Sequence, residues 1–183
     1  MPKPITIPAT ELWDPIEHRF HDVKERTITL EHSLLSLSKW ESKWKVHFIG
    51  NKNLTAEQLL DYFKCMTIEK NVDPMVYLCL GNEQIQEILK YIDDPMTATW
   101  FGKSEDDIAT LTDNRVVTSE LIYYWMFANG ISKDCERWHL NKLITLIHVF
   151  SEENKPKKKR SQAEKMAHHR SLLRARRAQR RRH

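Results

Sequence analysis

The stretch TITLEHSLLSLSKWESKW, residues 27–44, decides how this chain folds. Its first four residues alternate polar and apolar side chains, which is the period of two that is typical of a strand. From about Glu31 the apolar residues recur every three or four positions, at Leu34, Leu37, Trp40 and Trp44. This spacing is typical of a helix with one apolar face. The sequence therefore predicts a strand that passes directly into a helix ending near Lys45.

The residues before this stretch have the pattern of extended backbone. Residues 5–7 and 11–13 are rich in β-forming side chains, a turn signal follows at Asp14-Pro15, and residues 19–21 continue the pattern. Two strands alone would be marginally stable in water, so they need a surface to pack on. We expect residues 1–30 to form a small β-hairpin-like unit packed on the body.

Helix signals dominate the chain from there to residue 154. At Thr55 the hydroxyl can accept from the third amide of a helix while Gln58 reaches back, which predicts a helix over 55–66. Asp73-Pro74 marks another start. Asn82 is expected to cap a helix that Asp94-Pro95 ends, and further helices are predicted over 118–128 and 133–151. The fold class is therefore mainly α, a single helical domain over 31–154.

The helix predicted at 118–128 is apolar on every side. A helix of this kind is normally surrounded by protein. We expect it to pack against the next helix as a hairpin, with Asn129-Gly130 as the turn.

The charge of the chain is divided unequally. Residues 155–183 hold 13 of the 29 Lys and Arg residues and one of the 25 acids, a net charge of +12. The other residues therefore carry −8. Pro156 separates this tail from the last helix of the body, and its composition favours a helix. Because like charges one turn apart repel, we expect the helix to form only on an anionic surface.

Three interpretations of the tail remain open: it binds nucleic acid, it binds an acidic protein or the acidic body, or it is a solvated tail. The tail has no aromatic residue, so stacking on single-stranded bases is not supported. A short basic run of this kind also resembles a nuclear import signal, a pattern that occurs often by chance. The tail residues proposed to contact a partner are Lys157, Lys158, Lys159, Arg160, Arg170, Arg174, Arg177 and Arg181.

Motifs for catalysis and metal binding are missing from the sequence. No G-x-S-x-G, phosphate-binding glycine loop or H-E-x-x-H occurs, and the histidines lack a Cys or carboxylate at ligand spacing. The three cysteines form no Cys-x-x-Cys pair, which is typical of reduced thiols in a cytosol. We predict that the protein is not an enzyme and has no catalytic residue, cofactor or metal site. The longest apolar run, Leu121–Ala128, is too short to span a membrane, so we expect a soluble intracellular protein.

Trp40 and Trp44 are the remaining candidates for a binding site. They lie one helical turn apart within KWESKWK, residues 39–45, among charged residues. Aromatic residues with a charged rim are typical of binding surfaces, and large aromatic residues are also typical of cores. Both interpretations stay open at this point, and the first makes Trp40 and Trp44 partner-binding residues.

Several long segments together resemble a family of small proteins encoded by tailed bacteriophages and prophages. These segments are LEHSLLSLSKWESKW at 30–44, DPMTAT at 94–99, ELIYYWM at 120–126, WHLNKLITLI at 138–147 and the basic tail. The match extends over most of the chain.

The resemblance implies a tail assembly chaperone of a long-tailed phage. Such a protein would coat the tape-measure protein, a long helical rod, in the host cell cytoplasm and deliver it to the major tail protein. Exposed apolar faces and Trp40 and Trp44 would form the coating surface, with the tail as a second, electrostatic contact. The alternative is a nucleic-acid-binding or virion structural protein that uses residues 155–183. The sequence leaves open whether the protein forms a homo-oligomer.

Overall fold

The computed structural model describes residues 1–14, 18–99, 116–154 and 166, and the chain divides into two units, Met1–Glu152 and Glu153–His183. Of the second unit only residues 153, 154 and 166 are described, so the predicted basic C-terminal helix, apart from Met166, lies outside the described residues. The first unit is mainly helical with a small antiparallel β unit. The predicted fold class is correct at this level.

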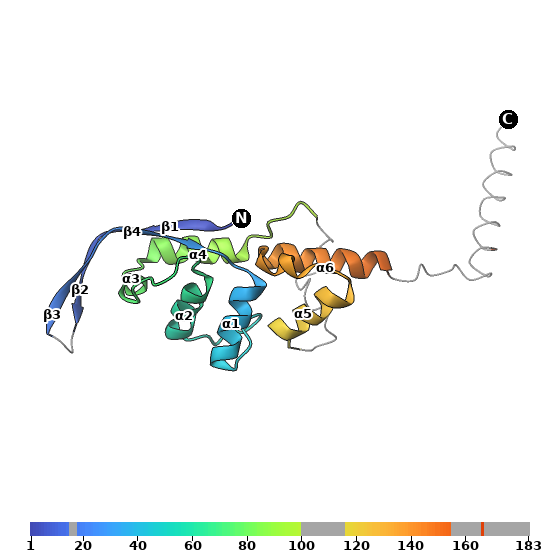
Figure 1. The fold of residues 1–183 in the computed structure, drawn as a ribbon, viewed down its shortest axis with the longest axis horizontal. Helices are drawn as coiled ribbons and strands as arrows, with labels where there is room; N and C mark the ends of the chain where they lie inside the picture. Colours follow the sequence, from blue (N-terminus) through green and yellow to red (C-terminus); the bar gives the residue numbers. More distant parts are fainter. Residues whose placement is uncertain (15–17, 100–115, 155–165, 167–183) are drawn as a thin grey trace, which may run out of the picture. The chain divides into compact units, whose positions relative to one another are not determined.

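The described residues among the first thirty form an antiparallel ribbon with two halves (Figure 1). β1 (Lys3–Ile7) pairs with β4 (Arg26–Leu30), and β2 (Thr10–Asp14) pairs with β3 (Arg19–Val23). Two residues on each strand separate the halves, and the pairing register is the same on both sides of this interruption. The predicted hairpin-like unit is therefore present.

The first half of the ribbon packs on the helices. Ile5, Ile7, Ile28 and Leu30 are fully buried, and β1 lies against α4 (Asn82–Asp93). Residues 66–69 close the outer edge of β4, because Thr29 accepts from the amide of Ile68 at 2.9 Å and Met66 accepts from that of Glu31 at 2.8 Å. Two strands alone bury too little surface to be stable, and β1 and β4 bury more by packing on the helices.

The next two helices begin where the sequence predicts. α1 (Leu34–Trp44) follows the N-cap Ser33 and ends at Lys45, which has a left-handed conformation. α2 (Ala56–Met66) follows Thr55, and both hydrogen bonds of the predicted cap are present, from the Gln58 amide to the threonine hydroxyl and from the Thr55 amide to the glutamine side chain. Local capping fixes both starts.

The structure corrects two predicted helix starts, the cap at Asn82 and the start at Lys133. α3 (Met75–Leu78) is a single turn after Pro74, and Gly81, not Asn82, is the N-cap of α4. The helix predicted to begin at Lys133 is divided into a 3-10 turn, η2 (Lys133–Arg137), and α6 (Leu140–Asn154). The division arises because His139 forms a β-bridge with Ser33 and the Leu140 amide donates to the His32 carbonyl at 2.9 Å.

α5 (Ser119–Ala128) begins after Thr118 and ends at Asn129, as predicted. Its packing differs from the prediction, because it contacts α1 more extensively than it contacts α6. Ser119, Ile122 and Met126 form its buried side.

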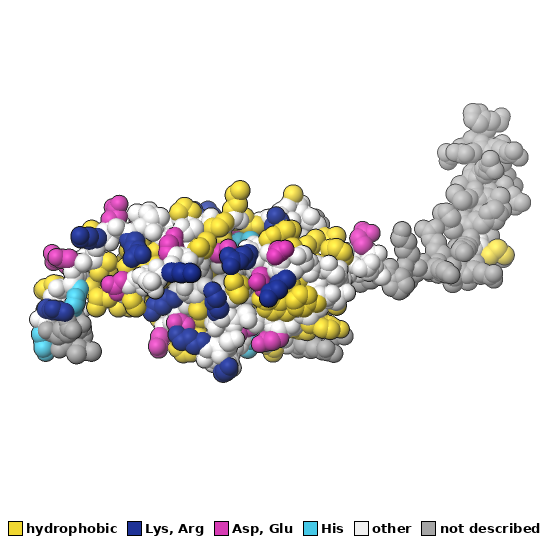
Figure 2. Space-filling view, viewed as in Figure 1, with side chains coloured by type: hydrophobic (Ala, Val, Ile, Leu, Met, Phe, Trp, Pro, Cys, Tyr) yellow, Lys and Arg dark blue, Asp and Glu magenta, His cyan; other side chains and the backbone are white. Residues whose placement is uncertain are grey.

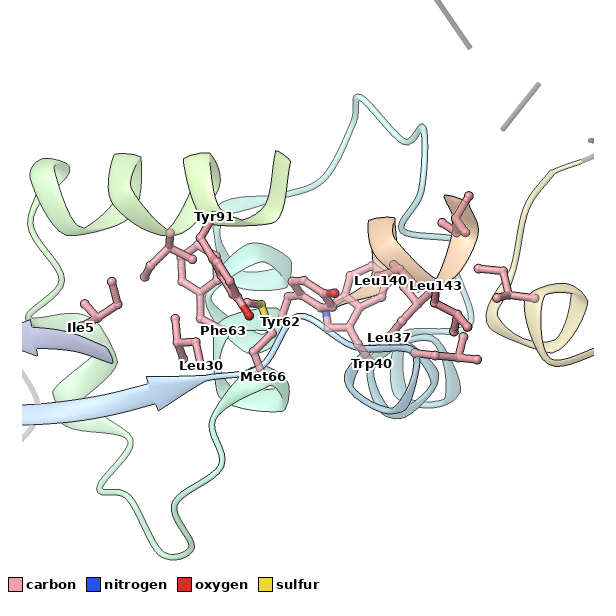
Figure 3. Close-up of a cluster of buried hydrophobic side chains, with 14 of the residues drawn as sticks. Ile5, Leu30, Leu37, Trp40, Tyr62, Phe63, Met66, Tyr91, Leu140 and Leu143 are labelled. Atoms are coloured by element: carbon pink, nitrogen blue, oxygen red, sulfur yellow. The ribbon is translucent and has the colours of Figure 1, made fainter. Parts of the chain in front are cut away.

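The core runs through the first unit between the ribbon and the helices. Figure 3 shows Ile5 and Leu30 of the ribbon near Phe63 and Tyr91, and Trp40 with Leu37 near Leu140 and Leu143. Most of these side chains are 2% exposed or less, and at about 25 cal/mol per Å² their burial is the main force that holds the elements together.

Glu41 is a buried acid on α1 that ties two segments to this core. Its carboxylate accepts from the amide of Phe48 at 3.1 Å and from the amide of Ser119, the first residue of α5, at 2.7 Å. The N-terminus of a helix carries partial positive charge, which favours a carboxylate there. Glu41 is only 7% exposed, and its two oxygens satisfy the backbone amides of Phe48 and Ser119.

We expect Glu41→Ala to lower the free energy of unfolding by about 2 kcal/mol or more, because it leaves two amides without an acceptor. Glu41→Gln keeps one acceptor and should cost less. The measurement is urea denaturation, together with hydrogen exchange of the Ser119 amide, which should become faster. Glu83→Ala, an exposed acid on α4, is the control and should change stability by about 0.5 kcal/mol at most. Equal losses for the Glu41 and Glu83 variants would contradict the role of Glu41.

Candidate functional site

The tail residues proposed as partner contacts lie outside the described residues. These are Lys157, Lys158, Lys159, Arg160, Arg170, Arg174, Arg177 and Arg181. Their role stays a prediction from charge.

Trp40 is a core residue. Its side chain is fully buried, and its indole N–H donates to the Gln58 carbonyl at 2.8 Å. The ring also packs edge-on against Phe48 and Tyr62, with centroid distances of 5.2 and 6.2 Å. The interpretation of Trp40 as a partner-binding residue is therefore wrong, because a partner could reach it only if α1 and α2 separated.

Trp44 is half-buried and serves the same contact between α1 and α2. Its indole N–H donates to Asp61 at 2.8 Å, and Lys43 binds the other oxygen of this carboxylate at 2.5 Å. Burial alone would raise the pKa of Asp61, but the hydrogen bonds from Lys43 and Trp44 outweigh it, so the pKa lies below its usual value. The Trp40 and Trp44 pair therefore joins two helices and does not form an exposed patch.

The exposed apolar surface lies instead on α5. Tyr124 and Phe127 leave 66% and 55% of their surface exposed, and Tyr123 stacks on Phe127 with a centroid distance of 6.1 Å. Figure 2 shows hydrophobic side chains gathered over the region of α5 and α6. The prediction that protein surrounds α5 is wrong for this face. The signal was present in the sequence, since a helix without a polar side exposes apolar groups wherever its own domain leaves it uncovered.

A second exposed aromatic pair, Trp13 and Phe20, lies on the second half of the ribbon. Sequence pattern alone could not select this pair, because the same strand pattern is expected for a covered hairpin.

Four buried residues form a polar cluster within the core. The Tyr62 hydroxyl and His32 Nδ1 are 2.7 Å apart, the Tyr91 hydroxyl accepts from the His32 amide at 3.3 Å, and His139 Nε2 lies 2.9 Å from the Tyr91 carbonyl oxygen. The rings of His32 and His139 meet edge to face at 5.0 Å. Burial, followed by the charge of His139, lowers the pKa of His32 to about 3, and burial also lowers the pKa of His139. Both are therefore neutral at pH 7 and act as packed hydrogen-bonding groups.

A groove of about 490 Å³ lies between α1, residues 65–70 and Arg137. Its rim carries acids and bases, including Lys39 and Glu69. Burial raises the pKa of the Cys65 thiol, which makes it a poor nucleophile at neutral pH. Glu69 is already bound, since both its oxygens accept from the Thr29 amide at 3.0 and 2.9 Å. We find no nucleophile and base at hydrogen-bond distance among the residues that line this groove.

The described part of the chain contains no group of three or more His, Cys, Asp or Glu side chains with the geometry of a metal site. None of its helices combines the length and apolar character that crossing a membrane requires.

Comparison with known proteins adds no relative: no protein-family model, no curated protein and no solved structure matches the chain. The function must therefore be argued from the sequence and from the described surfaces.

The histidine pair predicts how stability depends on pH. An unfolded histidine has a pKa of about 6.5, whereas His32 has a pKa of about 3 in the fold. Below pH ~6.5 the unfolded chain therefore takes up protons that the folded protein excludes, and the free energy of unfolding falls as the pH falls. For His32 alone we expect a loss of about 1 kcal/mol between pH 6 and pH 5, and the lowered pKa of His139 acts in the same direction.

Urea denaturation at pH 7, 6 and 5 measures this effect. The range from pH 7 to pH 5 separates the effect of the histidines from that of Asp61, Glu69 and Glu120. The pKa values of these acids lie below their usual range, so their contribution to the free energy of unfolding is lost only at lower pH. His32→Gln should reduce the pH dependence, because it removes the histidine whose pKa burial lowers to about 3. An unchanged slope in His32→Gln would contradict the assignment.

Proposed function

We propose that this protein is a non-enzymatic tail assembly chaperone of a tailed bacteriophage, with the tape-measure protein as its partner. The resemblance of four long sequence segments to a phage protein family supports this proposal. The observation that carries it is the exposed apolar face of α5, where Tyr124 and Phe127 lie side by side along one helix.

The α5 face suits a helical partner. Residues three apart on a helix lie on neighbouring positions of its surface, so Tyr124 and Phe127 offer two aromatic anchors about one turn apart. A long helical protein repeats its apolar residues at the same spacing, and such stripes bind apolar helix faces. Large aromatic side chains dominate the energy of contacts of this kind. Many copies could then cover the stripe of a tape-measure protein until the tube replaces them.

The packing of α5 against α1 holds the exposed face of α5 in a fixed position. Ile122 and Met126 fix the opposite side of α5 in the core, and Glu41 holds its first amide. The exposed rings are therefore presented by a helix that is already ordered, which lowers the entropic cost of binding.

The test is co-expression with the tape-measure protein of the same phage, followed by affinity purification of the complex. We expect the double substitution Tyr124→Ser and Phe127→Ser to reduce recovery of the partner at least tenfold. The control is Ile68→Ser and Leu78→Ser, which removes two exposed apolar side chains away from α5. No complex with the wild-type protein would overturn the proposed function, and equal losses in both variants would overturn the role of α5.

The charge of the tail supports nucleic-acid binding as a second candidate function. Thirteen cations against one acid would release counterions from a duplex, with about 0.9 log units of affinity lost per phosphate contact for each tenfold rise in salt. Deletion of residues 155–183 should then abolish retention on immobilised duplex DNA at 50 mM salt. If the truncated protein is retained as well as the whole chain, the tail is not the binding element.

A further inference from the structure

The two halves of the β-ribbon differ in what covers them. β1 and β4 have α4 on one side and residues 66–69 along an edge. On the second half, Trp13 and Phe20 are 48% and 63% exposed, and their ring centroids lie 4.9 Å apart. This half therefore presents an aromatic pair outside the core.

Glu11 and Asp22 lie on the same face of the ribbon as this aromatic pair. Glu11 is paired with Asp22, and Trp13 with Phe20, in the strand register. Paired residues, and residues two apart on one strand, share a face. Both acids are exposed, and like charges directly opposite each other destabilise a strand pair. A cationic ligand would relieve this repulsion.

We propose that Glu11, Trp13, Phe20 and Asp22, the aromatic-acidic face, bind the arginine-rich segment 155–183 of a second copy of the chain. A guanidinium group stacks on aromatic rings and donates paired hydrogen bonds to carboxylates, so this face offers both kinds of contact that arginine makes. The segment carries +12, whereas the rest of the chain carries −8, so it is the cationic part of this protein.

The arginine-rich segment and the aromatic-acidic face are different parts of the same chain and carry opposite charge, so each copy offers both halves of the contact. A contact between two different surfaces repeats from copy to copy and produces a head-to-tail row. This inference does not depend on the proposed function.

The test uses a fluorescein-labelled peptide with the sequence of residues 155–183. It is titrated with nuclease-treated, full-length protein, and binding is read by fluorescence anisotropy. We expect saturable binding at 50 mM salt that weakens at least tenfold at 300 mM salt, because exposed charges are screened at higher salt. Absence of binding at 50 mM salt, or binding that needs nucleic acid, would overturn the proposal.

Variants of the face separate a specific site from general attraction to an acidic protein. Glu11→Lys with Asp22→Lys should weaken peptide binding at least tenfold, and Trp13→Ala with Phe20→Ala at least fivefold. The matched control is Glu83→Lys with Asp93→Lys, which makes the same change in charge at two exposed positions of α4 and should have less than a threefold effect. Equal weakening by the ribbon and α4 charge variants would overturn the site.

Two further measurements do not depend on the folding of the variants alone. The first locates the peptide on the wild-type protein, and the second tests whether the binding partner is a second copy of the chain. The indole N–H signal of Trp13 in a ¹⁵N spectrum of the wild-type protein, identified with Trp13→Phe, should shift on addition of the peptide. Sedimentation of the full-length protein at 50 mM salt should give a mass that rises with concentration, and Glu11→Lys with Asp22→Lys should abolish the rise. A Trp13 signal that does not move would overturn the site, and a constant monomer mass would overturn the assignment to a second copy.

Discussion

The fold depends on the passage from strand to helix at residues 30–33, because α2, α4 and α6 all form hydrogen bonds with the backbone there. The end of α2 reaches it through the bridge between Leu30 and Thr67 and the hydrogen bond from the Glu31 amide to Met66. Tyr91 of α4 accepts from the His32 amide, and the start of α6 donates to the His32 carbonyl. Buried backbone groups must find partners, and here three helices provide them, so four residues set the relative positions of ribbon and helices.

The same segment explains which parts of the fold the sequence could predict. Signals that act within one turn, such as the change of period at Glu31 and the reciprocal cap of Thr55 and Gln58, were sufficient for the starts of α1 and α2. The late start of α6 was not predictable in this way. It arises because His139 pairs with Ser33, more than a hundred residues earlier, and a local pattern cannot contain that contact. The partner of α5 was missed for the same reason, since Glu41 and Ser119 meet only in three dimensions.

Residues 39–45 show why composition alone does not identify a binding site. Residues 39–45 combine aromatic and charged side chains, a composition that binding surfaces and helix contacts share. In the fold Trp40, Glu41, Lys43 and Trp44 each have a partner within the chain, so these four side chains hold the domain together. The exposed aromatic residues lie elsewhere, on α5 and on the second half of the ribbon. Composition identified the right kind of side chain but could not show which side chains the fold leaves uncovered.

The geometry of strands and helices accounts for one of these uncovered surfaces. Residues 3–14 of the ribbon extend ~40 Å at ~3.3 Å per residue. α4, on which β1 packs, has 12 residues and reaches only ~18 Å at ~1.5 Å per residue. By strand alternation Trp13 continues the row of Ile5 and Ile7, whose side chains are buried, but the helix ends before this row does. A ribbon of this length must extend beyond a helix with the same number of residues, so its second half can become stable only by contact with something other than α4.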